Sequence, residues 1–167
     1  MRAAPIRDFE QSLPMELLKA RESAMARFRP MLRDHGLTEQ QWRVIRALAA
    51  FDKIDASELA RRSFLLAPSL TRILQYLEGE NIVTRSSDAN DQRRAVFALT
   101  VRGRKVFELV GPDSEVLYAE IEQAFGKKKL GLLYDLLAEF SHVLSTTSEE
   151  TSARPANRVS QKKAANR

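Results

Sequence analysis

Cysteine is absent from this chain of 167 residues. Its absence excludes disulfides, zinc sites with thiolate ligands and thiol-based redox switches. No apolar run approaches the roughly 18 residues that a membrane span needs, and the N-terminal residues lack the apolar core of a secretory signal. We therefore expect a cytoplasmic protein that has no membrane partner.

Aromatic residues are also scarce, at 7%, and glycine and proline number six each, which favours helices over a turn-rich β-sandwich. Nucleophile motifs, phosphate-binding loops and clusters of metal ligands are missing, and His35 and His142 stand in no ligand or triad spacing. We expect no enzyme, no cofactor and no metal site. The length predicts one domain. The net charge of +5 favours a polyanion as partner.

The first half of the chain contains two strong helix signals. Apolar residues at steps of three, four and seven predict a helix over 14–34. Pro30 should kink its end, because a proline ring clashes with the carbonyl four residues back. Thr38 and Gln41 have the spacing of a capping box. They predict a second helix that ends near Phe51.

Two further short helices follow. Asp55 and Glu58 repeat the capping spacing and predict the start of a third helix. The segment 66–82 predicts a fourth, with Pro68 at its first position and Gly79 at its end.

The remaining elements are a hairpin and two long helices. Residues 83–87 and 95–99 are extended runs joined by a loop of about seven residues, as in a β-hairpin. Helices resume from Thr100, and Gly111-Pro112 predicts a kink or break. The final helix is expected at about 127–144.

This order predicts a fold that is mainly α with a small β-hairpin wing, namely a winged helix-turn-helix. We divide the chain into a flexible N-terminus (1–12), one domain (13–147) with a winged-helix module (37–100) and dimerisation helices (14–34 and 101–146), and a disordered basic tail (148–167). The outer helices have wide apolar faces that need a partner. A second copy of the chain, related by a two-fold axis, is the simplest partner; an intramolecular bundle in a monomer is the alternative.

The helix expected over 67–80 has one polar face. Its outward residues include one arginine and no acid between positions 67 and 77, whereas an ordinary solvated face carries several Lys and Glu. Arginine pairs well with guanine, glutamine with adenine, and a threonine methyl with thymine. This face therefore predicts DNA recognition by Pro68, Ser69, Thr71, Arg72 and Gln75.

The expected wing, residues 85–97, is rich in arginine. Arginine at a hairpin tip suits a narrow minor groove. Asp and Asn tolerate the tight turn, and Asp91 has the spacing to hold the guanidinium of Arg93 by a charge-assisted pair. We expect the wing to contact DNA through Arg85, Asn90, Asp91, Arg93 and Arg94. The alternative is a surface hairpin with an incidental ion pair.

The run from Thr38 to Leu48, the segment LAPSLTRIL and the wing sequence DANDQRR resemble the multiple-antibiotic-resistance regulator (MarR) family of dimeric winged-helix repressors. The resemblance covers residues 13–146. More narrowly, LLKARESAMARFRP, LTEQQWRVIR and YDLLAEF look like the members that repress homoprotocatechuate-degradation operons. The resemblance implies a homodimer on a palindromic operator, released by a small aromatic acid. Asn90 stands where the common wing pattern has arginine, so minor-groove contact is expected from Arg93 with support from Arg94.

Effectors of that family bind where the dimerisation helices meet the reading module. An aromatic acid needs an apolar slot and one guanidinium for its carboxylate. We expect these from Arg21, Met25, Phe28, Trp42, Arg46, Phe64 and Leu66. The alternative is that Arg21 pairs with an acid across the dimer and that the aromatic residues are plain core.

Two other functions remain open on the sequence alone. The same DNA-binding mode is compatible with another effector, such as a hydroxycinnamate or its thioester. Winged helices also serve as protein-interaction modules, and such a module would not need Arg93.

Overall fold

The computed structural model describes residues 8–9, 12–88, 91 and 93–152, with side chains described as far as residue 146. The chain divides into two compact units, residues 1–118 and 119–167. Most of the expected flexible N-terminus lies outside the described residues. In the part that is described, no helix is long and apolar enough to cross a membrane.

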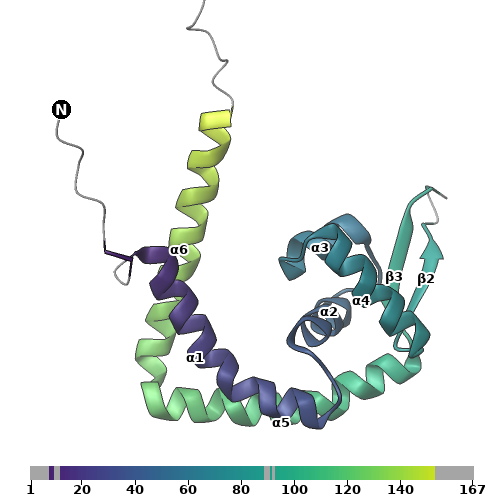
Figure 1. Ribbon diagram of the computed structural model, residues 1–167, viewed down its shortest axis with the longest axis horizontal. Coiled ribbons are helices and arrows are strands. Elements are labelled where there is room, and N and C mark those ends of the chain that lie inside the picture. The colour runs from purple at the N-terminus through teal and green to yellow at the C-terminus, as the bar shows by residue number, and fades with distance from the viewer. Residues whose placement is uncertain (1–7, 10–11, 89–90, 92, 153–167) are drawn as a thin grey trace, which may run out of the picture. The chain divides into compact units, whose positions relative to one another are not determined.

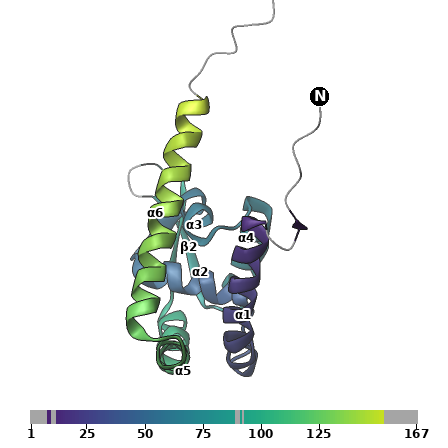
Figure 2. The same ribbon diagram turned by 90° about the vertical axis from the view of Figure 1, so that its left-hand side faces the viewer.

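The described elements follow the predicted order, with one addition (Figures 1 and 2). They are α1 (Leu13–Asp34), α2 (Glu39–Ala50), β1 (Ile54–Asp55), α3 (Ala56–Ser63), α4 (Ala67–Gly79), β2 (Val83–Ser87), β3 (Ala95–Leu99), α5 (Val101–Phe125) and α6 (Lys127–Ser152). The predicted fold class, mainly helical with a small hairpin, is confirmed.

Capping begins α2 and α3 as expected. The Thr38 hydroxyl accepts from the backbone N–H of Gln41 at 3.2 Å, and the Gln41 side chain accepts from the Thr38 N–H at 2.8 Å. Asp55 caps α3 by accepting from the N–H of Glu58 at 3.0 Å. The second half of that box is missing, because the Glu58 carboxylate binds two arginines of the next turn, Arg61 and Arg62.

A three-stranded antiparallel sheet replaces the expected two-stranded hairpin. Its order is β1-β3-β2, with Ile54 opposite Phe97 and Val83 opposite Leu99. The sequence analysis did not include β1, because two residues are too few to show a periodic pattern. The hairpin itself has the predicted bounds, 83–87 and 95–99, and stands beside α4 (Figure 1).

One core joins these elements in the first unit. Apolar side chains of α2, α3, α4 and the sheet meet in it, and Val44, Ile45, Leu59 and Leu77 are fully buried. Val110 of α5 belongs to the same core. The second half of α1 lies beside α5, because Phe28 packs on Tyr118 with ring centroids 4.9 Å apart and His35 contacts Asp113 at 2.7 Å.

The break expected at Gly111-Pro112 is wrong. Helix α5 passes through this pair without one. Val110 and Ser114, which flank the pair, are both buried, so packing holds the helix on either side of the missing N–H. Helix α1 ends at Asp34, the predicted end, with Pro30 inside it, and the kink expected at Pro30 stays a prediction.

The expected start of the disordered tail is also too early. The backbone of α6 is helical to Ser152, whereas the expected domain ended at residue 147. Residues 153–167, the rest of the expected basic tail, lie outside the described residues.

The start of α5 is packed tightly against the turn between α4 and β2. The Thr100 hydroxyl donates to the Asn81 carbonyl at 2.6 Å and accepts from the N–H of Gly103 at 3.0 Å. A Cβ atom at Gly103 would lie only 2.1 Å from the carbonyl oxygen of Ile82. Glycine is therefore required at position 103 by this close approach.

The second unit contains the end of α5 and α6. Gly126 joins the two helices with φ +97°, a left-handed conformation that glycine adopts without strain. Many large apolar side chains of α6 are exposed in the chain, among them Leu132, Leu133, Tyr134, Leu136, Leu137, Val143 and Leu144.

Candidate functional site

Helix α4 has the two faces that its sequence predicts. Leu70, Ile73, Leu74 and Leu77 are buried. The opposite face exposes Pro68, Thr71, Arg72 and Gln75, with Ser69 half-buried. The Thr71 hydroxyl donates to the carbonyl of Ala67 at 2.9 Å, so its methyl group and its two oxygen lone pairs remain for contacts with a partner. This face combines hydrogen-bonding groups with a single cation.

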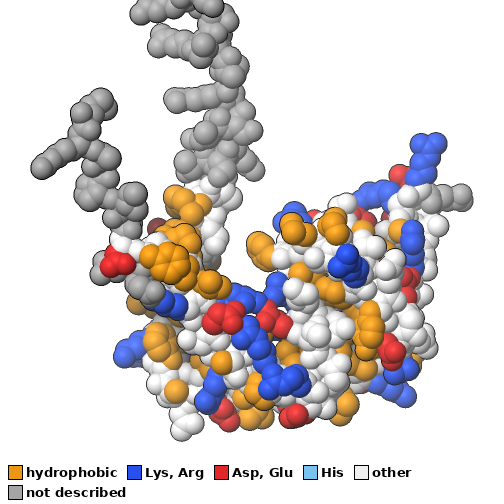
Figure 3. Space-filling model, in the orientation of Figure 1, with side chains coloured by type: hydrophobic (Ala, Val, Ile, Leu, Met, Phe, Trp, Pro, Cys, Tyr) orange, Lys and Arg blue, Asp and Glu red, His pale blue; other side chains and the backbone are white. Residues whose placement is uncertain are grey.

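Arginine side chains also gather on the hairpin. Arg85 on β2 and Arg93 in the loop line one small hollow with Ser86, Ser87 and Ala95. Figure 3 shows Lys and Arg side chains over this part of the molecule. Two guanidinium groups on one surface give the hairpin the type of side chain that pairs well with phosphate. Asn90, the expected tip residue, lies outside the described residues.

The two aspartates of the loop, Asp88 and Asp91, stabilise its turn by accepting backbone hydrogen bonds. The Asp88 carboxylate accepts from the backbone N–H of Asp91 at 3.2 Å, and the Asp91 carboxylate accepts from the N–H of Arg93 at 3.0 Å. The expected ion pair between Asp91 and the Arg93 guanidinium is therefore wrong. An Asp side chain two residues before an N–H closes a local turn, which leaves the Arg93 guanidinium exposed.

Arg94 has a different environment from Arg93. Its guanidinium lies 2.5 Å from the carboxylate of Asp55, the N-cap of α3. The pKa of Asp55 is lowered, first by the hydrogen bond from the Glu58 N–H and also by the charge of Arg94. Arg94 thus ties the loop end of the hairpin to α3, a role that was not predicted from the sequence.

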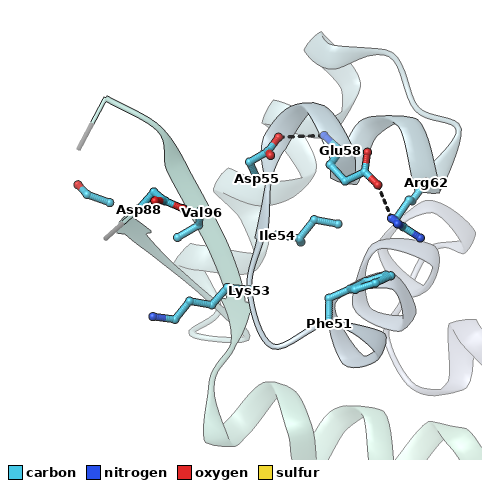
Figure 4. Close-up of a pocket in the computed structure, with 9 residues that line it drawn as sticks. Phe51, Lys53, Ile54, Asp55, Glu58, Arg62, Asp88 and Val96 are labelled. Carbon is cyan, nitrogen blue, oxygen red and sulfur yellow. Dashed lines mark hydrogen bonds and ion pairs between the residues drawn. The ribbon is translucent and has the colours of Figure 1, made fainter. Parts of the chain in front are cut away.

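A shallow groove lies between the hairpin and α3 (Figure 4). Its lining residues are Phe51, Lys53, Ile54, Asp55, Glu58, Arg62, Ser87, Asp88 and Val96. The Arg62 guanidinium stacks over the Phe51 ring at 4.3 Å and pairs with Glu58. None of the expected effector residues lines this groove, and two of its charged groups, Glu58 and Arg62, bind each other.

Some of the expected effector residues do come together, between α1, α2 and α5. The Arg46 guanidinium donates to the Tyr118 hydroxyl at 3.1 Å and lies 5.9 Å from the centre of that ring. The Phe28 ring packs on the same Tyr118 ring, with the two centroids 4.9 Å apart. The sequence analysis missed Tyr118, because nothing in the sequence indicates a contact across 72 residues.

The other expected effector residues are dispersed. Trp42 is buried and stacks on Phe107 at 5.8 Å, and Met25 is half-buried on α1. Phe64 and Leu66 are 88% and 78% exposed. The structure gives these last two no part in the cluster around Arg46, since they lie in the connection between α3 and α4.

Arg21 is part of an ion-pair network within the chain. It contacts Glu22 at 2.6 Å and also Glu39 on α2. The alternative considered for this residue was an acidic partner across the dimer, whereas the acids that it contacts belong to the same chain. A single guanidinium on an apolar stripe does not describe the surroundings of Arg21.

Comparison with known proteins identifies the family. A model described as "MarR family" matches residues 35–94. The chain is 41% identical over 139 residues to the HTH-type transcriptional regulator FarR of Neisseria gonorrhoeae, covering 83% of this chain and 95% of that protein. It is 40% identical over 139 residues to the homoprotocatechuate degradative operon repressor of Escherichia coli, covering 83% and 94%.

A solved structure is similar to this chain in both fold and sequence. The crystal structure of NadR in complex with 4-hydroxyphenylacetate has a TM-score of 0.72 and 42% sequence identity, covering 82% of this chain and 97% of that one. The prediction that the chain is no enzyme is confirmed, since the relatives are transcriptional regulators. The resemblance stated from the sequence is confirmed as well: the chain belongs to the MarR family of winged-helix transcriptional regulators.

Proposed function

We propose that the chain is a dimeric repressor that binds a palindromic operator and leaves it when a small aromatic acid binds. The observation that carries this proposal is the outward face of α4. Thr71, Arg72 and Gln75 are exposed there, with no acid between positions 67 and 77. Such a face suits base edges in the major groove, while Arg85 and Arg93 of the hairpin suit the adjacent minor groove.

A second copy of the chain is proposed as the partner of the apolar faces on α1 and α6. On α1, Leu13, Leu17 and Leu18 are 37–47% exposed, and α6 exposes leucines over several turns. Surfaces of this kind mark interaction sites in soluble proteins. A two-fold dimer would place two copies of α4 about one turn of DNA apart, about 34 Å, which matches a palindrome.

The effector is proposed to be an aromatic acid bound beside Arg46 and Tyr118. The pair offers a guanidinium for a carboxylate and a hydroxyl for a phenolic group, next to the buried ring of Phe28. The relatives support this class of ligand: one is a repressor of homoprotocatechuate degradation and another binds 4-hydroxyphenylacetate. Control of an aromatic catabolic operon follows as part of the proposal.

DNA binding is tested by fluorescence anisotropy with a duplex from the region upstream of the protein's own gene. We expect Arg72→Ala to weaken binding chiefly to the specific site. Arg93→Ala should weaken binding to all sequences and lower the salt slope by about 1. Arg33→Ala on α1 is the matched control for a lost charge. Unchanged affinity in both of the first two variants contradicts the proposal and favours a protein-interaction module.

Effector release is tested in the same assay by adding 4-hydroxyphenylacetate. We expect the wild type to lose DNA affinity and Arg46→Ala to keep it. Sedimentation of the free protein at micromolar concentration tests the dimer. A monomer at micromolar concentration contradicts the proposed dimer. A wild type whose DNA affinity does not change with 4-hydroxyphenylacetate contradicts the proposed effector.

A further inference from the structure

We infer that Glu39 and Arg43 are positioning residues that couple the arginines of α1 to the entrance of α4. The inference rests on the proposed function only for its consequence, namely that an aromatic acid bound between α1, α2 and α5 acts on the DNA-reading helix. It is carried by an ion-pair network whose members lie on α1, on the first turns of α2 and at the end of α3.

Glu39 is the centre of this network. Its carboxylate contacts Arg21 and Arg29 of α1, the latter at 3.2 Å, and Arg43 of α2 at 2.7 Å. Glu22 of α1 shares both α1 arginines, at 2.6 Å from Arg21 and 2.8 Å from Arg29. The Glu39 side chain is only 17% exposed, so these contacts are less screened than those of a surface pair.

Arg43 links Glu39 on α2 to the end of α3. One terminal nitrogen binds Glu39, and the other donates to the backbone carbonyl of Ser63 at 3.0 Å. Ser63 is the last residue of α3 and is fully buried. A guanidinium holds two acceptors in a fixed fork. The position of the Ser63 carbonyl is therefore tied to that of the Glu39 carboxylate.

Ser63 stands just before α4. Phe64 follows in a left-handed conformation with φ 50°, which is unusual for an aromatic residue. Leu66 is the N-cap of α4 and has no side-chain cap. A segment held in an uncommon conformation needs support from its surroundings, and Arg43 supplies it from α2.

The charges of the network explain how a bound anion would change the position of the Ser63 carbonyl. Three guanidinium groups face two carboxylates, so the network has one surplus positive charge. The proposed effector pocket borders this network, because Phe28 packs on Tyr118 and is followed on α1 by Arg29. A carboxylate bound there competes with Glu39 for Arg29. Glu39 then loses a contact on α1, and Arg43 passes the change to the carbonyl that precedes α4. Physical coupling of this kind is shown only by measuring it between the two sites.

Amide hydrogen exchange on the full chain tests the link without any effector. We expect Arg21→Ala to raise exchange at residues 64–70 by about threefold, because that segment loses support. Lys19→Ala, which removes the 3.3 Å contact with Glu16 on the same helix, should leave those amides unchanged. In an Arg43→Lys background, Arg21→Ala should have no further effect on them. An unchanged rate at 64–70 in Arg21→Ala overturns the inference.

The second arm measures the ratio of DNA affinity without and with 4-hydroxyphenylacetate. Arg43→Lys keeps the charge and loses the fork. We expect it to reduce this ratio by about tenfold while the Kd for 4-hydroxyphenylacetate stays within about twofold. Arg61→Lys, which alters a similar arginine paired with Glu58, is the matched control. A ratio in Arg43→Lys equal to that of the control overturns the inference.

The proposed function and the coupling through Arg43 can be contradicted independently of each other. If 4-hydroxyphenylacetate leaves the DNA affinity of the wild type unchanged, the proposed effector is wrong, and the exchange result alone decides the role of Glu39 and Arg43. If the wild type responds and Arg43→Lys responds equally well, the proposed function stands and the coupling through Arg43 is wrong.

Discussion

The guanidinium of Arg94 lies 2.5 Å from the carboxylate of Asp55, which precedes it by 39 residues. Asp55 belongs to β1 and also caps α3. The backbone N–H of Asp88 bonds to the Arg94 carbonyl at 2.9 Å, where the hairpin loop closes. The contact between Arg94 and Asp55 therefore fixes the hairpin relative to the helices of the DNA-reading module.

Replacing Arg94 should separate positioning from phosphate contact. We expect Arg94→Ala to weaken DNA binding without changing its salt slope, whereas Arg93→Ala lowers the slope by about 1. The effect on unfolding should stay below about 1 kcal/mol, because the Arg94 side chain is 58% exposed. Anisotropy titrations at several salt concentrations measure the slope. An equal loss of slope in both variants would show that Arg94 contacts phosphate, as the sequence suggests.

Acid should remove one stabilising interaction from α3. The pKa of Glu58 is lowered from 4.5 to about 2, chiefly by the hydrogen bond from Arg61. A carboxyl whose folded pKa is lowered stabilises the fold above its unfolded pKa and loses this effect as the pH falls. We expect the stability difference between wild type and Glu58→Gln to shrink between pH 4.5 and pH 2. Urea unfolding at several pH values measures it, with Glu16→Gln as the control; a constant difference contradicts the prediction.

Even alanine at position 103 should destabilise the fold. The added Cβ would lie 2.1 Å from the Ile82 carbonyl oxygen and 3.2 Å from a methyl carbon of Leu99, so α5 would have to move. We expect Gly103→Ala to lower the free energy of unfolding by about 1–3 kcal/mol. Gly111→Ala in the same helix has nothing within 4 Å of its Cβ. It should raise stability by about 0.5–1 kcal/mol, and denaturant melts of both variants compare the two positions.

Tyr118→Phe should weaken the response to aromatic acids. The change removes the hydroxyl that accepts from Arg46 and keeps the ring that packs on Phe28. We expect binding of 4-hydroxyphenylacetate to weaken by about tenfold, since a hydrogen bond to a charged group contributes about 1.5 kcal/mol or more. Calorimetry measures the affinity, and DNA binding without ligand is the control. Equal affinities for both proteins would remove Tyr118 from the proposed site.

Local patterns predicted most of the helices and the hairpin. Capping at Thr38 and Asp55 needs only residues three apart, and the strands at 83–87 and 95–99 have a clear bounded pattern. The helix break expected at Gly111-Pro112 was wrong because tertiary packing holds α5 together around Pro112.

Contacts between distant parts of the chain were not predictable in the same way. The pairs Arg94–Asp55 and Arg46–Tyr118 join residues on separate elements, and a sequence alone does not say which charged groups meet. Phe64 and Leu66 were placed with the effector residues because they are apolar, yet the fold leaves them exposed. The face of α4 was predictable because helical periodicity alone determines it.

The order β1-β3-β2 also bears on how the protein behaves at high concentration. With β3 in the centre, β2 is an outer strand, and its residues from Thr84 to Ser87 are polar and exposed. A short outer strand with a charged side chain such as Arg85 is a poor template for strands of other molecules. The hairpin therefore has a basic surface that does not favour edge-to-edge aggregation of the free protein.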